Sequence, residues 1–411
     1  MKFTVERDAL AEAVTWAARA LPSRPVIPVL GGLLLDASDG GLTLSCFDYE
    51  VSARMRVPAE VSEPGTALVP GRLFAEITRS LPGLPVDFAD DPDGLSMICG
   101  EVAFIVALLP SAEYPGLPEL PLLAGVTDGA ALAAAIGQVA PAASRDDTLP
   151  MLTAVSLEFT AETMTLAATD RYRLAVRELD WRPASWIGEQ DGGCGKIAVL
   201  APARTLAEAA RMMTSGEPVR IFLRDPDRDP GSDPGTGAGA DSRGGDAMIG
   251  FEAGERRLTT RLLAGEFIRY RSRFPAEFGC SADLPAEAFA EALRRVSLVA
   301  ERGTPVRLSF APGRVTIGAA TQGQARARET VPADFTGDEP VIAFNPHYLL
   351  DGVVAAAVTG PAHMDGPVPD STRIRLRFSG ASKPAVITGG HADGAAANYF
   401  RYLVVPQRVQ S

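Results

Sequence analysis

Histidine and cysteine are scarce in this sequence of 411 residues. The three histidines, which stand far apart, are His347, His363 and His391. The four cysteines, none of them close to another, are Cys46, Cys99, Cys194 and Cys280. Zinc sites and disulfide frameworks are marked by closely spaced cysteines or histidines, so we expect no metal, no cofactor and a reduced set of thiols.

Long apolar segments are missing as well. The longest, residues 26–35, is interrupted by Pro28 and is shorter than the roughly 20 residues that a membrane helix requires. The N-terminal segment becomes charged at Glu6 and lacks the apolar core of a secretory signal. We therefore expect a cytoplasmic protein without membrane contact.

The chain is acidic, with 39 basic and 51 acidic residues and a formal net charge of −12. This balance argues against a nucleic-acid binder that is basic throughout, although a local basic surface is compatible with it. Hydrophobic residues make up 46% of the chain and charged residues 22%. These values are ordinary for globular proteins, and the length suggests about three domains.

A helix-forming pattern occurs three times. Apolar residues at i, i+4, i+7 and i+11 share one face of a helix, and they stand at Leu10, Val14, Ala17 and Leu21, at Leu132, Ile136, Val139 and Ala143, and at Phe289, Leu293, Val296 and Ala300. Each helix leads through a proline into strand-like residues, at 28–36, 150–159 and 305–310. Corresponding residues of the first two units lie 122 positions apart, from Leu10 and Leu132 in the helices to the acidic residues Asp48 and Asp170. The sequence therefore consists of three repeats.

A second helix recurs in each repeat. In the first two it carries Arg-x3-Glu-x2-Arg, as Arg72, Glu76 and Arg79 and as Arg204, Glu208 and Arg211. These positions share one face of a helix, and in the first repeat the other face is predicted to hold Leu73, Phe74, Ile77 and Leu81. In the third repeat, residues 344–358 have the same proline-led start but neither arginine.

Each repeat therefore predicts a strand, a helix and three strands, then a second helix and more strands. Strands without regular helical crossovers favour antiparallel sheets, so we predict an α+β fold with two helices per domain. Proline-rich segments place the domains at 1–124, 125–278 and 279–411. Residues 224–246 are rich in Asp, Gly and Pro and are expected to form a mobile loop.

Charge is segregated within the first repeat. Residues 1–124 contain 8 basic and 17 acidic side chains, whereas the helical segments 7–24 and 71–81 contain five arginines against three acidic residues. A positive helix face on an acidic domain is typical of a protein that touches a polyanion with its helices only. The alternative is a solvated helix face whose charges pair with one another.

Catalytic motifs are missing. Asp146 and Asp147 beside Asp170 could form a carboxylate cluster, but their context favours loop and turn residues. The glycine-rich segment within 224–246 is not followed by a helix pattern that could present its N-terminus to phosphate. We therefore expect a protein that is not an enzyme; an enzyme or ligand-binding protein that reuses the repeats is the weaker alternative.

Four separated motifs resemble the bacterial DNA polymerase III beta subunit, the DNA sliding clamp. They are LPSRPVIPVLGGLLLD at 21–36, TDRYRLAVRE at 169–178, GEFIRYRSRFP at 265–275 and YLVVPQRV at 402–409. The resemblance covers essentially the whole chain. It implies a head-to-tail homodimer that closes a six-domain ring around duplex DNA, with helices lining the pore and no catalytic group.

The resemblance also assigns roles to single residues. The arginines expected to face DNA in the pore are Arg24, Arg72, Arg79, Arg204 and Arg211. Such contacts would be non-specific and made to phosphates, because base-specific contacts would stop sliding. Phe104, Val106 and Leu298 are expected to pack across the dimer contact, and the alternative is that they are ordinary core residues.

The family's other site is a hydrophobic groove between the second and third domains. It implies binding of short linear peptides from the DNA polymerase III alpha subunit, the clamp loader, other polymerases and repair proteins. By motif, the groove residues are Leu152, Thr169, Arg171, Arg173, Leu174, the segment from Ile268 to Arg273, Pro384, Leu403, Val405, Pro406, Gln407 and Arg408. An apolar C-terminal tail predicts an edge strand that is tied down rather than frayed.

Three groove positions depart from the family. Where it usually has Pro, an aliphatic residue and Met, this chain has Ile268, Arg273 and Gln407. Ile268 lacks the fixed backbone angle of Pro, and Arg273 puts a cationic side chain where an aliphatic one would offer apolar contact. Both the shape and the polarity of the groove are therefore expected to differ from those of the family. The sequence therefore also suggests a paralogue that resists a groove-directed inhibitor, an antibiotic resistance role; neutral drift at the groove rim is the alternative.

Overall fold

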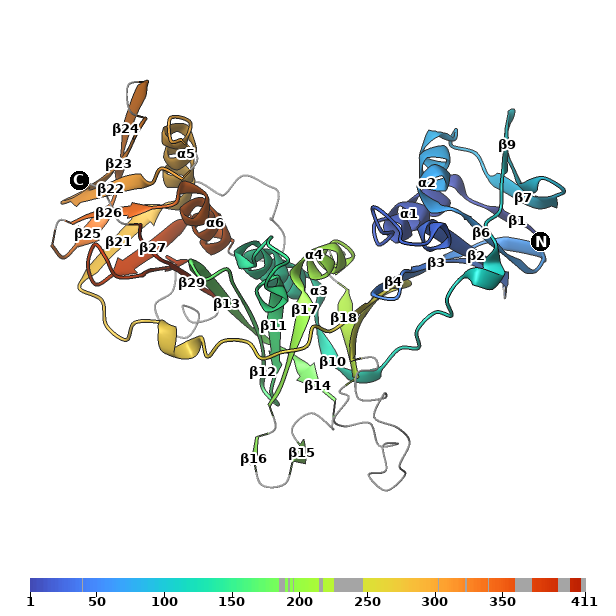
Figure 1. The fold of residues 1–411 in the computed structure, drawn as a ribbon, viewed down its shortest axis with the longest axis horizontal. Helices are drawn as coiled ribbons and strands as arrows, with labels where there is room; N and C mark the ends of the chain where they lie inside the picture. Colours follow the sequence, from blue (N-terminus) through green and yellow to red (C-terminus); the bar gives the residue numbers. More distant parts are fainter. Residues whose placement is uncertain are drawn as a thin grey trace. The chain divides into compact units, whose positions relative to one another are not determined.

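The structure is a computed structural model of the whole chain (Figure 1). It describes residues 1–38, 40–184, 196–213, 217–224, 247–301, 303–321, 324–338, 340–358, 372–390 and 400–407, together with the backbone of 189–190 and 193–194. The chain divides into unit 1, Met1–Val126 with Glu217–Leu262, and unit 2, Thr127–Gly216 with Leu263–Ser411. The predicted loop 224–246 lies, apart from Arg224, outside the described residues.

The described residues of unit 1 form two α-helices, α1 and α2, and strands from two sequence segments. In chain order the elements are β1 (Lys2–Val5), α1 (Arg7–Ala18), β2 (Gly32–Ser38), β3 (Gly41–Phe47), β4 (Val51–Pro58), β5 (Glu60–Glu63), β6 (Gly65–Pro70), α2 (Gly71–Ser80), β7 (Val86–Asp91), β8 (Gly94–Cys99), β9 (Val102–Val106), most of β10 (Leu122–Asp128), β18 (Pro218–Arg224), β19 (Met248–Ala253) and β20 (Arg256–Arg261).

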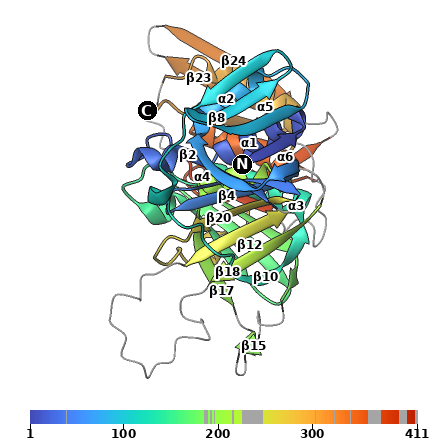
Figure 2. The same cartoon turned by 90° about the vertical axis from the view of Figure 1, so that its right-hand side faces the viewer.

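The sheets of unit 1 are antiparallel, as predicted. One sheet has the strand order β5-β1-β7-β8-β9, and in the other the strands of unit 1 follow the order β10-β18-β19-β20-β4-β3-β2-β6. The pair β4 and β20 joins strands from the first and second repeats, with Ala53 opposite Leu258 (Figure 2). Two repeats therefore share one continuous sheet.

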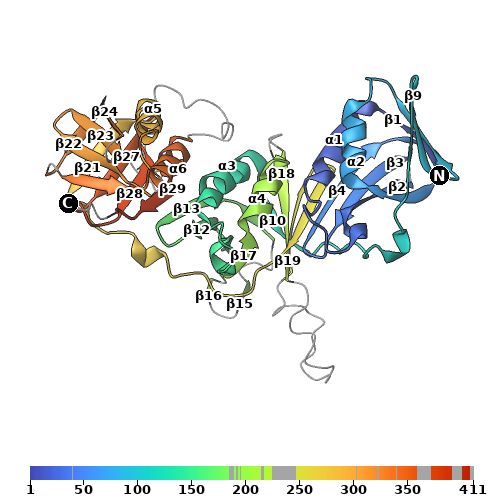
Figure 3. The same cartoon turned by 45° about the horizontal axis from the view of Figure 1, so that its top comes forward.

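Helices α1 and α2 pack against each other and against the sheet that contains β2, β3, β4 and β6 (Figure 3). The predicted face of α1 is buried, with Leu10 and Val14 fully inaccessible. On α2, Phe74 is fully buried, but Leu73 is 51% exposed, contrary to the predicted face. Successive helical residues are about 100° apart, so Leu73 lies beside the buried stripe rather than in it.

Unit 2 contains the other four α-helices of the described residues. In chain order its elements are α3 (Gly129–Val139), β11 (Ala154–Phe159), β12 (Thr163–Thr169), β13 (Arg173–Asp180), β14 (Arg182–Pro183), β15 (Glu189–Gln190), β16 (Gly193–Cys194), β17 (Ile197–Pro202), α4 (Ala203–Ala210), β21 (Cys280–Pro285), α5 (Ala286–Ser297), β22 (Val306–Ala311), β23 (Arg314–Thr321), β24 (Ala325–Pro332), β25 (Asp334–Thr336), β26 (Val341–Phe344), α6 (Pro346–Ala357), β27 (Arg373–Phe378), β28 (Ala385–Gly389) and β29 (Phe400–Val404).

A nine-stranded antiparallel sheet runs through unit 2 in the order β17-β11-β12-β13-β29-β28-β27-β21-β25. A four-stranded sheet has the order β24-β23-β22-β26. Helix α3 packs against α4, and α5 packs against α6 (Figure 3). Each repeat therefore has two helices among antiparallel strands, and the α+β prediction is confirmed. The predicted strand count is wrong: five strands rather than three separate the two helices, β2 to β6 in the first repeat and β22 to β26 in the third. No helix in the described ranges is long and apolar enough to cross a membrane.

Candidate DNA-facing helices and peptide groove

The predicted DNA-facing arginines of unit 1 lie in solvent. Arg24 follows α1, and Arg72 and Arg79 lie on α2 opposite its buried stripe; all three are exposed. Arg72 donates a hydrogen bond to the carbonyl oxygen of Pro22 at 3.1 Å, and Arg79 donates one to that of Ala75 at 3.1 Å. Among the described residues neither guanidinium forms an ion pair, so both charges are available to an anion.

The corresponding arginines of unit 2 are arranged differently. Arg204 is exposed on α4, and Arg211 caps the C-terminal end of that helix. Arg211 binds the carboxylate of Glu208 at 2.6 Å. The solvated, internally paired face that was the alternative interpretation therefore applies at the end of α4, whereas Arg72 and Arg79 of α2 form no ion pair with the residues that the structure describes.

The predicted dimer residues lie on β9 and at the end of α5. Strand β9 is an edge strand of the five-stranded sheet. On it Val106 is 3% exposed and belongs to the core of its own unit, Phe104 is half-buried, and Ile105 is 55% exposed. Leu298, at the C-terminal end of α5, is 85% exposed. An apolar side chain this open has contact area to offer a partner.

The motif TDRYR forms the tight turn between β12 and β13. A carboxylate oxygen of Asp170 accepts hydrogen bonds from the backbone N–H groups of Tyr172 and Arg173, both at 3.0 Å. The hydroxyl of Thr169 donates to the carbonyl of Arg173 at 2.6 Å. Arg171 lies at the corner with a φ of 81°, which is rare for a residue with a side chain. Asp170 is therefore a turn residue.

The other two acidic residues of the rejected catalytic cluster also serve a loop. Asp146 accepts a hydrogen bond from the backbone N–H of Thr148 at 3.0 Å, and its own N–H donates to the hydroxyl of Ser144 at 3.1 Å. Asp146 and Asp147 are exposed. The backbone hydrogen bond with Thr148 lowers the pKa of Asp146, which keeps this carboxylate ionised rather than tuned for proton transfer.

Arg173 is the centre of a buried polar network. Its guanidinium binds Asp170 at 2.9 Å, forms a close ion pair with Asp351 of α6, and lies 4.5 Å from the ring centre of Tyr348. Tyr402 of β29 is within 3.5 Å. Burial acts to lower the pKa of Arg173, but Tyr402 and the two carboxylates outweigh it and raise the pKa. The side chain of Arg173 is buried, with 8% of the residue exposed. Its contacts with Asp170 and Asp351 link the second repeat to the third.

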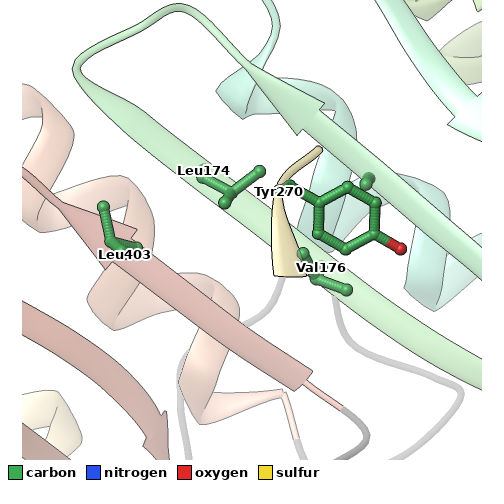
Figure 4. Packing of buried hydrophobic residues seen from close by; sticks show 5 residues of the cluster. Leu174, Val176, Tyr270 and Leu403 are labelled. Carbon is green, nitrogen blue, oxygen red and sulfur yellow. The ribbon is translucent and has the colours of Figure 1, made fainter. Parts of the chain in front are cut away.

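An apolar cluster lies beside this network. Leu174 and Val176 of β13, Leu403 of β29 and Tyr270 pack together with Ala167 (Figure 4). Phe267, Phe274 and Val405 are partly buried against the cluster. The segment around Tyr270 packs over the paired strands β13 and β29, and its partly buried residues leave apolar surface exposed beside them. A groove that binds an apolar peptide requires such a surface.

Glu158 anchors the segment that carries Tyr270. Its carboxylate accepts hydrogen bonds from the hydroxyl of Tyr270 at 3.1 Å and from Arg271 at 2.9 Å, and it pairs with Lys196 at 2.8 Å. Burial acts to raise the pKa of Glu158, but the two cations outweigh this effect and lower it. The segment is thus attached to β11 by charge as well as by packing.

The C-terminal tail lies inside the sheet rather than at its edge. Strand β29 pairs with β13 on one side and with β28 on the other, so the predicted edge strand is an inner strand. Beyond it, the N–H of Val405 donates to the carbonyl of Tyr172 at 2.8 Å, and that of Gln407 donates to Ala343 at 2.8 Å. Hydrogen bonds on both sides therefore hold the described part of this segment, up to Gln407, in place.

A hollow of about 1350 Å³ opens next to the tail. Val405, Pro406 and Gln407 line it, together with Tyr172 and with residues of α6 and the four-stranded sheet. The hollow therefore meets the apolar cluster at Val405, which belongs to both.

The remaining predicted groove residues surround this region in different states of exposure. Leu152, Thr169, Leu174 and Leu403 are buried. Ile268 is 38% exposed, Arg171 and Arg273 are exposed, and Pro384 is half-buried. Arg408 lies outside the described residues. The sequence analysis did not identify Tyr348 and Asp351 as residues of this region. Asp351 could have been found, because it is the single acidic residue in the apolar pattern of α6.

The comparisons with known proteins agree on one family. Its sequence models match in order, with the N-terminal domain of the DNA polymerase III beta subunit at residues 1–118, the central domain at 127–268 and the C-terminal domain at 271–407. The beta sliding clamp of Streptomyces coelicolor is 46% identical over 410 residues, 100% of both chains. The beta sliding clamp homolog GriR of Streptomyces muensis is 39% identical over 409 residues, 99% of both chains.

Solved structures show the same similarity. The sliding clamp of Pseudomonas aeruginosa bound to griselimycin has a TM-score of 0.82 and 26% identity, and that of Bacillus subtilis has a TM-score of 0.81 and 25% identity, each over 100% of both chains. Three repeated two-helix domains and these matches define a sliding clamp, a non-catalytic class of replication protein. The chain belongs to the family of the DNA polymerase III beta subunit and is a processivity factor of that polymerase.

Proposed function

We propose that two copies of this chain join head to tail into a closed ring around duplex DNA. The single observation that carries this proposal is the match of three successive family domains along the entire chain. The exposed Leu298 and the edge strand β9 give each copy two different surfaces for its partner. We keep 1–124, 125–278 and 279–411 as the three domains of each copy, and we place the protein in the cytoplasm.

The proposed DNA contact is electrostatic and independent of base sequence. Arg24, Arg72 and Arg79 of the first domain and Arg204 and Arg211 of the second would face the pore and neutralise phosphates. An acidic exterior would discourage DNA from binding outside the ring. Contacts of this kind release counterions and so depend steeply on salt concentration.

The proposed peptide site consists of the apolar cluster around Tyr270 and the adjoining tail. It would receive short linear motifs of the DNA polymerase III alpha subunit, the clamp loader, other polymerases and repair proteins. The cluster offers an apolar floor for side chains, while Arg171 and Arg273 at its rim are exposed. Binding would tether these partner proteins to DNA and would not catalyse a reaction.

The experiment that tests the ring uses nicked circular DNA loaded with labelled protein. The protein should stay bound to the closed circle and leave when a restriction enzyme linearises it, because a ring is held topologically. Replacing Arg72, Arg79, Arg204 and Arg211 with Glu should abolish retention while the circular dichroism spectrum is unchanged. Tight, sequence-specific binding to a short linear duplex would contradict the proposal.

A second candidate function is resistance to an inhibitor that occupies the groove. Two observations favour it: the 39% identity to the homolog GriR, and the departures at Ile268, Arg273 and Gln407. Ile268 and Arg273 are exposed and Gln407 is half-buried, so all three could touch a ligand. The clamp would then keep its partner peptides while binding the inhibitor weakly.

A further inference from the structure

Three arginines share one face of the four-stranded sheet of unit 2. Arg307 of β22 and Arg328 of β24 lie in one row across the sheet, with Gly318 of β23 between them. Arg326 precedes Arg328 by two positions and pairs with Ala320. Residues two apart on a strand point to the same side, so the three guanidinium groups border one surface. All three are exposed and line the hollow described above.

The surface between these arginines is hollow because its residues are small. A Cβ built on Gly318 would meet only the carbonyl oxygen of Ala327, at 3.9 Å, and one on Gly303 would meet nothing within 4 Å. Ser309 and Thr316 add hydroxyl groups to the lining. The result is an open trough with cationic sides and a low floor, which we call the arginine trough (Arg307, Arg326, Arg328 with Gly318 and Ala320).

The charge of the trough is not compensated by the residues that the structure describes. No ion pair involves Arg307, Arg326 or Arg328 there. The carboxylate of Glu329, on the same strand, points to the other face and binds Arg295 of α5 at 2.7 Å. Three open positive charges thus stand together in a protein whose formal net charge is −12. Guanidinium groups of this kind favour carboxylate partners.

The trough is continuous with the proposed peptide groove. The same hollow is lined by Tyr172, Tyr348 and the tail residues Val405 and Gln407, and Val405 also packs against the apolar cluster around Tyr270. A volume of about 1350 Å³ exceeds the roughly 300–1,000 Å³ of ordinary small-molecule sites. A peptide leaving the apolar cluster along the tail would therefore reach the arginines without turning back.

We propose that the arginine trough is an extension of the peptide groove and binds an acidic segment that flanks the apolar motif of a partner protein. This inference rests on the proposed peptide site and adds the chemistry of the residues next to the motif. The trough would select among partners, because a neutral or basic flank gains nothing there, whereas a run of Asp or Glu gains several charge pairs.

The test measures peptide binding by fluorescence anisotropy with the full-length protein. The probes are one clamp-binding peptide from the DNA polymerase III alpha subunit, extended at either end by four Asp or by four Ser. At low salt, the Asp extension at one end should strengthen binding about 5- to 30-fold over Ser, as for a few partly exposed charge pairs. The gain should shrink as salt screens the charges.

A triple variant, Arg307→Ser, Arg326→Ser and Arg328→Ser, should reduce that gain to less than about 2-fold and leave the Ser-extended peptide unaffected. The matched control is Arg19→Ser, Arg182→Ser and Arg294→Ser, three exposed arginines outside the hollow, which loses the same charge and should keep the gain.

Four results would overturn the inference. If the Asp extension still strengthens binding in the triple variant, or strengthens it at neither end in the wild type, the trough does not bind the acidic flank. Either result leaves the proposed peptide site unaffected. If the Ser-extended peptide fails to bind at all, the proposed peptide site itself is wrong. If size-exclusion chromatography shows that only the trough variant becomes monomeric, the arginines serve a second copy of the chain instead.

Discussion

The guanidinium of Arg173 lies 4.5 Å from the ring centre of Tyr348, so a strand of the second repeat and a helix of the third are held together at the proposed peptide site. The same group binds Asp170 and Asp351. Because the turn that carries Tyr172 also accepts the hydrogen bond from Val405, the position of the tail depends on this buried cation.

We expect Arg173→Leu to destabilise the protein by about 2–4 kcal/mol, because it leaves the nearly buried carboxylate of Asp170 and the half-buried one of Asp351 without compensation. Urea unfolding measures the loss, and the peptide affinity should fall with it. Arg171→Leu is the matched control, since Arg171 lies in the same turn but its side chain is exposed; it should change stability by less than about 0.5 kcal/mol. Equal losses in the two variants would show that the network has no special role.

The pH dependence of stability should report on Glu158. Its pKa in the folded protein lies below the ordinary value of 4.5 because Lys196 and Arg271 outweigh the effect of burial. The ionised carboxylate therefore stabilises the fold fully above that value, and the contribution is lost as the pH falls through the lower folded pKa. Wild type should lose more unfolding free energy than Glu158→Gln between pH 6 and roughly pH 3. Parallel curves for the two proteins would exclude this role.

Local periodicity was sufficient to predict most of the fold. The faces of α1 and α3 were predicted because a buried helix repeats its apolar residues at a fixed spacing, and Leu10 and Leu132 are indeed buried. The same reasoning failed at Leu73, where one residue beside the stripe is apolar but exposed. A pattern identifies the face of a helix, but it does not distinguish its border from its centre.

Local sequence patterns could not predict which strands pair when they are far apart in the sequence. The sequence predicted a strand at the C-terminus, but not that β29 would insert between β13 and β28, because partners far apart in sequence leave no local trace. The network of Arg173 was missed for the same reason, since Asp170, Asp351 and Tyr402 come from three elements. The groove residues themselves were predicted by resemblance, and their roles stay predictions.

Leu298 should control assembly. We expect Leu298→Asp to weaken the dimer at least about 30-fold, because a charge would replace an exposed apolar side chain in the proposed interface. Analytical ultracentrifugation over a concentration series measures the change. Val341→Asp is a control in the same domain, since Val341 is also an exposed apolar residue, at 49%. A dimer that is unchanged by Leu298→Asp would place the interface elsewhere.

Salt dependence should separate the arginines of α2 from those near α4. Because Arg72 and Arg79 form no ion pair in the described part of the chain, replacing both with Gln should reduce the slope of log affinity for linear duplex against log salt by about 2. Arg204→Gln with Arg211→Gln should reduce it less, because Arg211 is already paired with Glu208. The opposite order of the two slopes would contradict this electrostatic account.

The departures in the groove should be visible as a change in selectivity. Ile268→Pro with Arg273→Leu restores the fixed backbone and the apolar wall usual in the family, so the double variant should gain affinity for a groove-directed inhibitor relative to a partner peptide. One recovered apolar contact is worth about 10- to 200-fold, and both ligands can be titrated by calorimetry against the wild type and the variant. The matched control is Arg269→Leu, which removes an equally exposed charge from the same segment without restoring a family residue. If the double variant gains no inhibitor affinity relative to peptide affinity, the resistance function fails while the processivity function stands, because peptide binding by both proteins tests the latter separately.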